Sequence, residues 1–386
     1  MSKNKTILAV ILLLALIPLT ANATITRVIG LGGEGANYII KDAFNPNIWP
    51  QLLREWPNLA GAEFSTDGGP WDFYKAYVNY DFGEDKCVMQ IALDKEPGRK
   101  YTMAPADLDA VAGTYNRLSV ALGRPMGDLL VGVAINYTGK SYKADSISAT
   151  VPALDISYAT YGIRLGATAL EKKLDLALGI EIASFSEDVG ATTAIESDGS
   201  MSMAFAGRYW YTLNDRYALI PNAKFAMMKD AAKMGDDSQS ETTTTFGLGI
   251  GNNWQPVENM LAIFELGLMS TSDKYESKSG STSLSNTDSE MDIYWRLGFE
   301  TKIFGWLDGR FGAQRSWQSM TVETLPGKPE IGTTNTATYL GATAHWNRLY
   351  LDLLIAEAFM QHGPYFLSGV GGQTFNRVSL KYDFGK

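Results

Sequence analysis

Alternating apolar and polar residues dominate the chain from Trp71 to its end. Apolar residues occupy every odd position from 291 to 299, every even position from 174 to 182 and every even position from 378 to 384. A period of two is typical of strands with one apolar and one polar face. Many of these segments run for about ten residues, the length of a tilted membrane-spanning strand. The pattern predicts about sixteen strands, from Ala60–Ser65 to Thr374–Phe384, or fourteen without the first pair.

The predicted connections between strands alternate between short and long. Short at one rim and long at the other is typical of a transmembrane β-barrel, and an even strand number puts both chain ends at the short-turn, periplasmic rim. Tight turns are predicted at Gly83-Glu84-Asp85, Pro125-Met126-Gly127, Glu171-Lys172, Asn214-Asp215, Pro256-Val257-Glu258, Gly305-Trp306 and Trp346-Asn347-Arg348. Long polar loops are predicted at Gly139–Leu154, Ser186–Gly199, Lys229–Glu241, Ser270–Glu290, Thr321–Thr336 and Gln361–Gly372.

Aromatic residues cluster near the ends of the predicted strands, where a barrel has its interfacial girdles. A soluble β-sandwich would show the same alternation with its polar face outward. Strand length, loop asymmetry and an export signal favour an all-β fold, a transmembrane antiparallel β-barrel. The aromatic residues are Tyr80, Phe82, Tyr137, Tyr209, Tyr211, Trp254, Trp306, Tyr382 and Phe384.

The export signal is the first 23 residues, which combine Lys3 and Lys5, an apolar run and a small-residue site at Ala21-Asn22-Ala23. This arrangement predicts a cleaved secretory signal peptide. The expected organisation is therefore a signal peptide (1–23), an N-terminal segment (24–58) and a barrel (59–386). The expected location is the outer membrane of a Gram-negative-type bacterium, with outer-membrane lipid and the barrel-assembly machinery as partners.

Composition removes several classes of function. The formal net charge of −9 is spread along the chain, which argues against nucleic-acid binding. With two histidines and only Cys87 for a thiol, we expect no metal site and no other cofactor. Gly30, Gly32 and Gly35 fit G-x-G-x-x-G, but a nucleotide-binding loop needs a preceding buried strand and a following helix in a βαβ unit. The mature chain lacks that context.

The segment Thr24–Asn58 lacks strand alternation and needs another place in the molecule. Ile48–Trp56 reads as a short amphipathic helix, with Pro50 in its first turn and Pro57 ending it. So much apolar surface favours a plug inside the lower half of the barrel over an extension resting beneath it. The candidate plug residues are Arg27, Gly30, Gly32, Gly33, Gly35, Asn45, Pro46, Trp49 and Trp56.

Strand periodicity assigns the polar faces to the lumen. Charges of both signs occur there, consistent with a solvated wall, an internal ion-pair network or a ladder for a solute. The candidate lumen residues are Lys75, Asp81, Arg117, Asp175, Glu181, Arg208, Lys224, Glu265, Arg296, Glu300, Asp308, Arg310, Asp352, Arg377 and Lys381.

The N-terminal segment resembles the start of the outer-membrane long-chain fatty acid transporter family (OMPP1/FadL/TodX). Arg27, Gly30-Leu31-Gly32-Gly33, Asp42-Ala43 and Asn45-Pro46 match its pattern, whereas Asn47 stands where the family has Ala. The resemblance implies a fourteen-stranded barrel occluded by an N-terminal hatch, which moves to admit hydrophobic molecules such as fatty acids or aromatic hydrocarbons.

Four functions follow from these observations. The first is a plugged transporter for hydrophobic or other small molecules. The second is an open diffusive porin, in which Ser270–Glu290 could form a constriction loop. A structural or interaction role for the outer loops is the third. The fourth, an enzyme, is disfavoured because no nucleophile and base can be assigned around His362 and Ser368 at the outer rim or His345 at the periplasmic side.

Overall fold

The computed structural model describes residues 24–65, 73–83, 86–97, 114–145, 153–189, 192–322, 330–355 and 375–385. Several predicted features lie outside these residues: the signal peptide at 1–23, part of the turn at 83–85, and the polar segment Gln361–Gly372 with His362 and Ser368.

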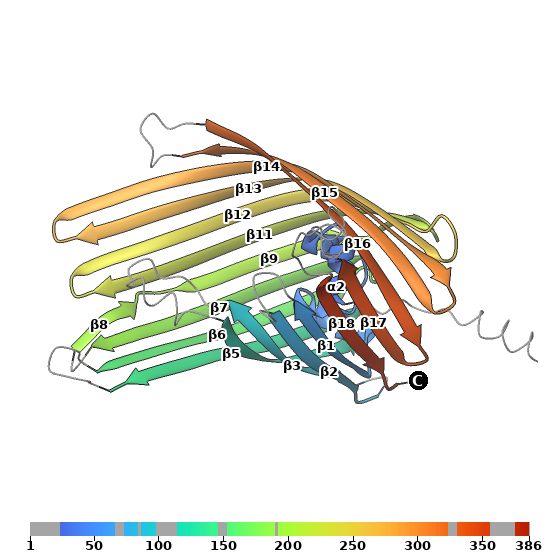
Figure 1. The fold of residues 1–386 in the computed structure, drawn as a ribbon, viewed down its shortest axis with the longest axis horizontal. Helices are drawn as coiled ribbons and strands as arrows, with labels where there is room; N and C mark the ends of the chain where they lie inside the picture. The colour runs from blue at the N-terminus through green and yellow to red at the C-terminus, as the bar shows by residue number, and fades with distance from the viewer. Residues whose placement is uncertain are drawn as a thin grey trace, which may run out of the picture.

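Strands make up most of the described chain, and each consecutive pair within the barrel wall is antiparallel (Figure 1). Their bounds are β1 (Leu59–Ser65), β2 (Phe73–Asp81), β3 (Val88–Pro97), β4 (Thr114–Met126), β5 (Leu129–Ala144), β6 (Leu154–Ala169), β7 (Leu174–Val189), β8 (Thr192–Ser197), β9 (Met201–Tyr209), β10 (Tyr211–Asn214), β11 (Tyr217–Met234), β12 (Asp237–Trp254), β13 (Met260–Ser279), β14 (Thr282–Phe304), β15 (Leu307–Thr321), β16 (Glu330–Trp346), β17 (Leu349–Ile355) and β18 (Phe375–Asp383).

The sheet closes on itself because β1 pairs with both β2 and β18. Segments β8, β9 and β10 follow one another along a single place in the wall, since β7 pairs with the first two and β11 pairs with all three. The described strands therefore form a closed antiparallel barrel of sixteen strands, as the alternation predicts. The fourteen strands implied by the family resemblance are wrong.

The observed connections between strands match the predicted tight turns but differ from two of the predicted long loops. The tight turns at 127–128, 170–173, 215–216, 255–259, 305–306 and 347–348 form where they are predicted. Two predicted long loops, Lys229–Glu241 and Ser270–Glu290, are instead strands joined by two-residue turns at Gly235 and Gly280. Beyond the apolar belt both strand faces contact water, so a Ser- and Thr-rich strand loses its alternation while its backbone ladder continues.

The other predicted loops are strands in part. Strand β7 runs to Val189 and β8 follows within Ser186–Gly199, β5 runs to Ala144, and β16 begins at Glu330. Figure 1 shows the long hairpins, such as β13–β14, extending to the left far beyond the described parts of β1–β3 and β17–β18.

The outer surface of the barrel is apolar and the inner surface polar. Along β7, Leu176, Leu178 and Ile180 are exposed on the outside, while Asp175 is buried inside. Tyr80, Trp254, Trp306 and other predicted girdle residues are exposed near strand ends, although Tyr209 and Phe384 are only half-exposed. Within the described residues, no helix is both long and apolar enough to cross a membrane.

The N-terminal segment folds into four short helical turns rather than one longer helix. These are the α-helix α2 (Ile25–Gly30) and the 3₁₀ helices η1 (Glu34–Tyr38), η2 (Asn45–Asn47) and η3 (Pro50–Glu55). The predicted amphipathic helix Ile48–Trp56 is wrong in kind, because only Pro50–Glu55 is helical and it is a 3₁₀ helix. Both Leu52 and Leu53 are buried, in different clusters, so its apolar residues do not form a single stripe.

Candidate functional site: the N-terminal segment inside the barrel

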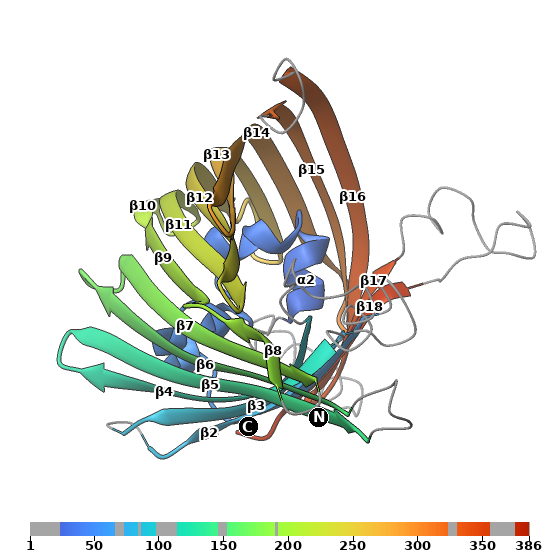
Figure 2. The ribbon, with the colours of Figure 1, turned by 90° about the vertical axis from the view of Figure 1, so that its left-hand side faces the viewer.

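The segment Thr24–Asn58 lies inside the ring of strands (Figure 2). Its apolar side chains pack against inward residues of the wall: Leu31 and Ile39 join Ile220 and Ile263, and Leu53 joins Val88. Trp49 is fully buried and contacts the ring of Tyr38 edge-on. The segment therefore belongs to the same packed core as the inner wall.

Arg27 is the centre of a buried ionic cluster near one end of the segment. Its guanidinium donates to both carboxylate oxygens of Glu300 at 2.7 Å and to Asp42 at 2.9 Å. Glu300 also contacts Arg310 at 3.2 Å, and Arg310 contacts Asp352 at 3.1 Å. Burial disfavours the charged form of Arg27, but the two carboxylates outweigh it and raise its pKa above the usual value. The segment and the wall thus share one charge network.

Asp42 closes the second side of this cluster and also organises a turn. Its carboxylate accepts from the backbone N–H of Phe44 at 2.9 Å, and its own N–H donates to Asn45 Oδ1 at 2.7 Å. Asn45 in turn donates to Asn37. Burial raises the pKa of Asp42 to about 6, although Arg27 pulls it down. The Asp42–Asn45 part of the family pattern is therefore a local turn joined to the wall through Arg27.

Arg208 holds the middle of the segment from the opposite wall. Its guanidinium donates to Asp175 at 2.8 Å and to the carbonyl oxygens of Asn37 and Ile40 at 3.0 Å. The rings of Trp49 and Trp210 lie on it, with centroids 4.8 and 5.1 Å from the guanidinium carbon. Stacking between two indoles suits a planar cation. One buried wall residue thus fixes both a backbone loop and a tryptophan of the segment.

Glycines of the wall make room for the backbone of the segment at two places. At the first seat, Gly298 pairs with Gly312 on β14–β15, and a Cβ at Gly312 would lie 2.5 Å from the backbone nitrogen of Gly32. Gly32 itself has a φ of +115°, which only glycine adopts without strain. Side chains at these positions would push the segment off the wall.

At the second seat, Gly123, Gly132 and Gly166 face one another across β4–β5–β6. A Cβ at Gly132 would overlap the backbone nitrogen of Gln51, and one at Gly123 would lie 3.0 Å from Leu53 Cβ. Three adjacent strands therefore carry glycine where Pro50–Leu53 presses against them. Such complementarity indicates that the wall and the segment are built to fit each other.

Ten of the fifteen predicted lumen residues are buried, and the other five, Asp81, Arg117, Glu181, Lys224 and Arg377, are half-buried. Most contact either an opposite charge or the segment: Lys75 donates to Asn47, Asp81 accepts from Arg54 at 2.6 Å, and Arg117 contacts Asp94 at 3.0 Å. Others pair within the wall, as Arg296 does with Glu265 at 2.9 Å and Asp308 with His345 at 2.7 Å. Glu181, Arg377 and Lys381 also have partners, whereas Lys224 lies over the ring of Tyr38. The inner wall is an ion-pair network rather than a row of solvated charges.

The predicted plug residues have equally specific surroundings. Gly30 and Gly33 lie against Arg310 and Gln314, and Gly35 lies against the guanidinium of Arg296. Asn45 and Pro46 form the turn η2, and Trp56 is half-buried beside Leu59. The glycines of the G-x-G-x-x-G pattern thus allow close packing against the barrel wall.

Several residues at the site escape the sequence reasoning. Asp42 pairs with Arg27 within the segment, and Asp94 pairs with Lys75 on the neighbouring strand. Glu63 accepts from the backbone N–H of Ile25, and the wall glycines pack against parts of the segment distant in the chain. Strand parity could have added Glu63 and Asp94 to the inward set. Asp42 belongs to the family pattern but is absent from the candidate plug residues, and no local pattern marks the two glycine seats.

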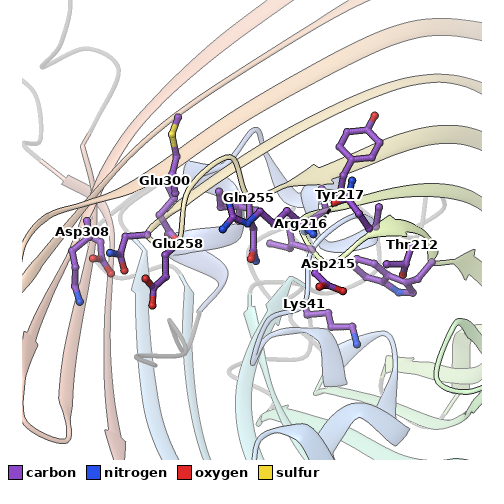
Figure 3. Close-up of a pocket in the computed structure, with 18 of the residues that line it drawn as sticks. Lys41, Thr212, Asp215, Arg216, Tyr217, Gln255, Glu258, Glu300 and Asp308 are labelled. Carbon is purple, nitrogen blue, oxygen red and sulfur yellow. Dashed lines mark hydrogen bonds between the residues drawn. The ribbon is translucent and has the colours of Figure 1, made fainter. Parts of the chain in front are cut away.

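A cavity of about 630 Å³ remains beside the segment at the short-turn rim (Figure 3). Lys41 and Trp56 of the segment face Asp215, Arg216 and Glu258 from the turns. Lys41 also contacts Glu55 at 3.6 Å and lies over the ring of Trp210. Among the described residues, no group of three or more His, Cys, Asp or Glu side chains could hold a metal ion. The cavity is a water-accessible chamber with charges of both signs.

No protein-family model and no curated protein matches the chain. Solved structures similar to it include the toluene transporter TodX of Pseudomonas putida, with 9% identity, 93% of this chain and 96% of that chain covered, and a TM-score of 0.41. The ferric yersiniabactin uptake receptor FyuA of Yersinia pestis has 10% identity, 77% and 53% coverage and a TM-score of 0.40. The translocator domain of the autotransporter NalP of Neisseria meningitidis has 13% identity, 67% and 90% coverage and a TM-score of 0.32. The chain spans about half the length of FyuA, and scores this low indicate neither a family nor a function.

Proposed function

We propose that this protein is an outer-membrane β-barrel that transports small solutes and that residues Thr24–Asn58 are its plug. The closed barrel with an apolar outer belt supports a membrane location, because only helices and closed barrels satisfy every backbone group in lipid. The predicted signal peptide supports export, and the surrounding partners would be outer-membrane lipid and the assembly machinery.

The single observation that carries the proposal is the fit between segment and wall. Buried ion pairs at Arg27 and glycine seats at Gly312 and Gly132 hold residues 24–58 in a lumen that is otherwise wide enough for water. An extension that merely rested under the barrel would need neither feature. The resemblance to the fatty acid transporter family adds a hydrophobic cargo as one version of this function.

The test is planar-bilayer conductance in potassium chloride, comparing the full chain with a variant lacking Thr24–Asn58. We expect the full chain to be silent or nearly so and the deletion variant to conduct steadily. A matched control deletes the hairpin tip Ser277–Leu284, which removes part of the barrel far from the segment. Heat-modifiable migration on gels checks that each variant forms a barrel.

Equal conductance of the full chain and the segment deletion would contradict the plug and indicate an open porin. A folded deletion variant that stays silent would contradict transport itself.

A further inference from the structure

Two cavities flank the same stretch of the N-terminal segment from opposite sides. The chamber at the short-turn rim touches Ile40 and Lys41. A second cavity, of about 350 Å³, lies beside Tyr38, Asn47 and Ile48. Its wall side is lined mostly by small residues, together with the two cations Arg164 and Lys224 and the phenylalanines Phe205 and Phe225. We call them the inner and outer cavities. Residues 37–41 lie between the two cavities, because Tyr38 lines the outer one and Ile40 and Lys41 line the inner one.

Three neighbouring strands show the same order of residues from one cavity to the other. Along the β9 wall, Trp210 lines the inner cavity, Arg208 is buried between the cavities, and Ala206 lines the outer cavity. Along β11 the order is Ala218, then buried Ile220 and Asn222, then Lys224.

Along β12 the order is Asn253, then Gly251, Gly249 and Gly247, then Thr245. All three glycines are covered, Gly251 by Ile39, Gly249 by Glu265 and Asn222, and Gly247 by Lys224. Because inward side chains recur every second residue, one inward position separates the cavities on the β9 wall, two on β11 and three on β12.

The barrier is held by hydrogen bonds to backbone carbonyl groups and by apolar packing. Arg208 donates to the carbonyl oxygens of Asn37 and Ile40, and Asn253 donates to that of Ile39. The Ile39 side chain fills the space above Gly251 and packs with Ile220 and Ile263. A Cβ added at Gly251 would lie 3.0 Å from the Cβ of Ile39. The rest of the segment is attached elsewhere, through Arg27 to β14 and through Pro50–Leu53 to β4–β6. Residues 37–41 could therefore move while both attachments stay in place.

We infer that solutes pass between residues 37–41 and the wall of β9, β11 and β12. The gate consists of Ile39 and of the hydrogen bonds that Arg208 donates to residues 37 and 40. This inference rests on the proposed plug function and adds where and how the plug opens. The gate opens by a local shift of five residues, and the segment as a whole stays inside the barrel.

The first test compares two truncations of equally buried side chains, Ile39→Ala and Leu53→Ala, by conductance in potassium chloride. Ile39→Ala empties the space above Gly251 and should raise the mean current at least about tenfold, since large-to-small core changes shift such equilibria by that much or more. Leu53→Ala removes a similar volume at the β4–β6 seat and should leave the current near that of the unmodified chain.

The second test keeps Ile39→Ala and adds a cross-link at the distant seat, Leu53→Cys with Gly123→Cys, in a Cys87→Ser background. A Cβ at Gly123 lies 3.0 Å from Leu53 Cβ, close to the roughly 3.5–4.5 Å of disulfides. We expect the current to persist after oxidation. Loss of current on oxidation and its return on reduction would overturn the local gate, because it would mean that Pro50–Leu53 must leave the wall before current can flow.

The deletion experiment separates the two proposals. If the variant lacking Thr24–Asn58 conducts but folded Ile39→Ala does not, the plug stands and the gate is wrong. If neither conducts, transport itself is wrong.

Discussion

The two halves of the N-terminal segment are held in the barrel by different physics. The first half, around Arg27, is held by buried charges whose partners lie on β14–β17. The second half, around Gln51, is held mainly by shape, because three wall glycines let its backbone approach closely, and one ion pair from Arg54 to Asp81 adds to it. Charge pairing resists separation strongly but depends on protonation, whereas close packing depends on volume and not on pH. A plug with both attachments can loosen in its middle without detaching at either end.

The largest effect is expected from Arg27→Ala, which removes the guanidinium that Asp42 and Glu300 share. Glu300 keeps Arg310, but Asp42 loses its partner in a buried site. Breaking a buried pair on one side costs about 3–5 kcal/mol. Hydrogen exchange of the amides from Ile25 to Lys41 should become much faster in the detergent-solubilised protein.

The control for this change is Arg27→Lys, which keeps a cation and should speed exchange less. Unchanged exchange in Arg27→Ala would show that the charge pairs do not hold the first half.

A medium effect is expected from Gly132→Ala, which tests the attachment by shape. The added methyl overlaps the backbone of Gln51, and overpacking of this kind costs about 1–3 kcal/mol. Exchange should rise for Pro50–Trp56 and not for the amides near Arg27. The matched control is Gly179→Ala on the same inner surface, where a Cβ meets only Arg164 at 3.8 Å. Equal exchange rates of Pro50–Trp56 in the two variants would contradict the claim that close packing at Gly132 holds this part of the segment.

The smallest effect is expected from Asp42→Asn, and it appears only as a change with pH. Burial raises the pKa of Asp42 to about 6 from 3.8, so the docked state binds a proton more readily than the released state. The contribution of Asp42 to docking should therefore weaken as pH rises from about 4 to 6 and stay constant above that.

The Asn variant should lose this part of the pH dependence. The measurement is exchange of the first half at pH 5 and pH 7, corrected for intrinsic rates. The same pH dependence in Asp42→Asn would assign it to another group.

The barrel could be predicted from the sequence because its signals are local. Alternation gave the inward set, and residues such as Asn347 and Gly127, with positive φ, mark the turns they occupy. The long hairpin Ser270–Glu290 was predicted as a loop because its Ser and Thr residues carry no apolar period, although they pair fully across β13–β14.

The site could be predicted only in outline. Arg27 and the segment glycines stood out as one group and Glu300, Arg310 and Arg296 as another, but the pairing between the two groups could not be predicted. Gly132 meets Gln51 across 81 positions of the chain, and Arg27 meets Glu300 across 273. Such contacts depend on how the closed wall curves around the segment, which no local pattern records.

The pairing of β1 with β18 has a consequence for how the molecule is made. The first and last strands are neighbours, and Thr26 of the segment contacts Ser379 on the last strand. Until the final strand is available, the wall has two open edges and the segment lacks part of its binding surface. Sealing of the cylinder and enclosure of its contents are then one event, and a chain that stops short of β18 would be left both unsealed and unfilled.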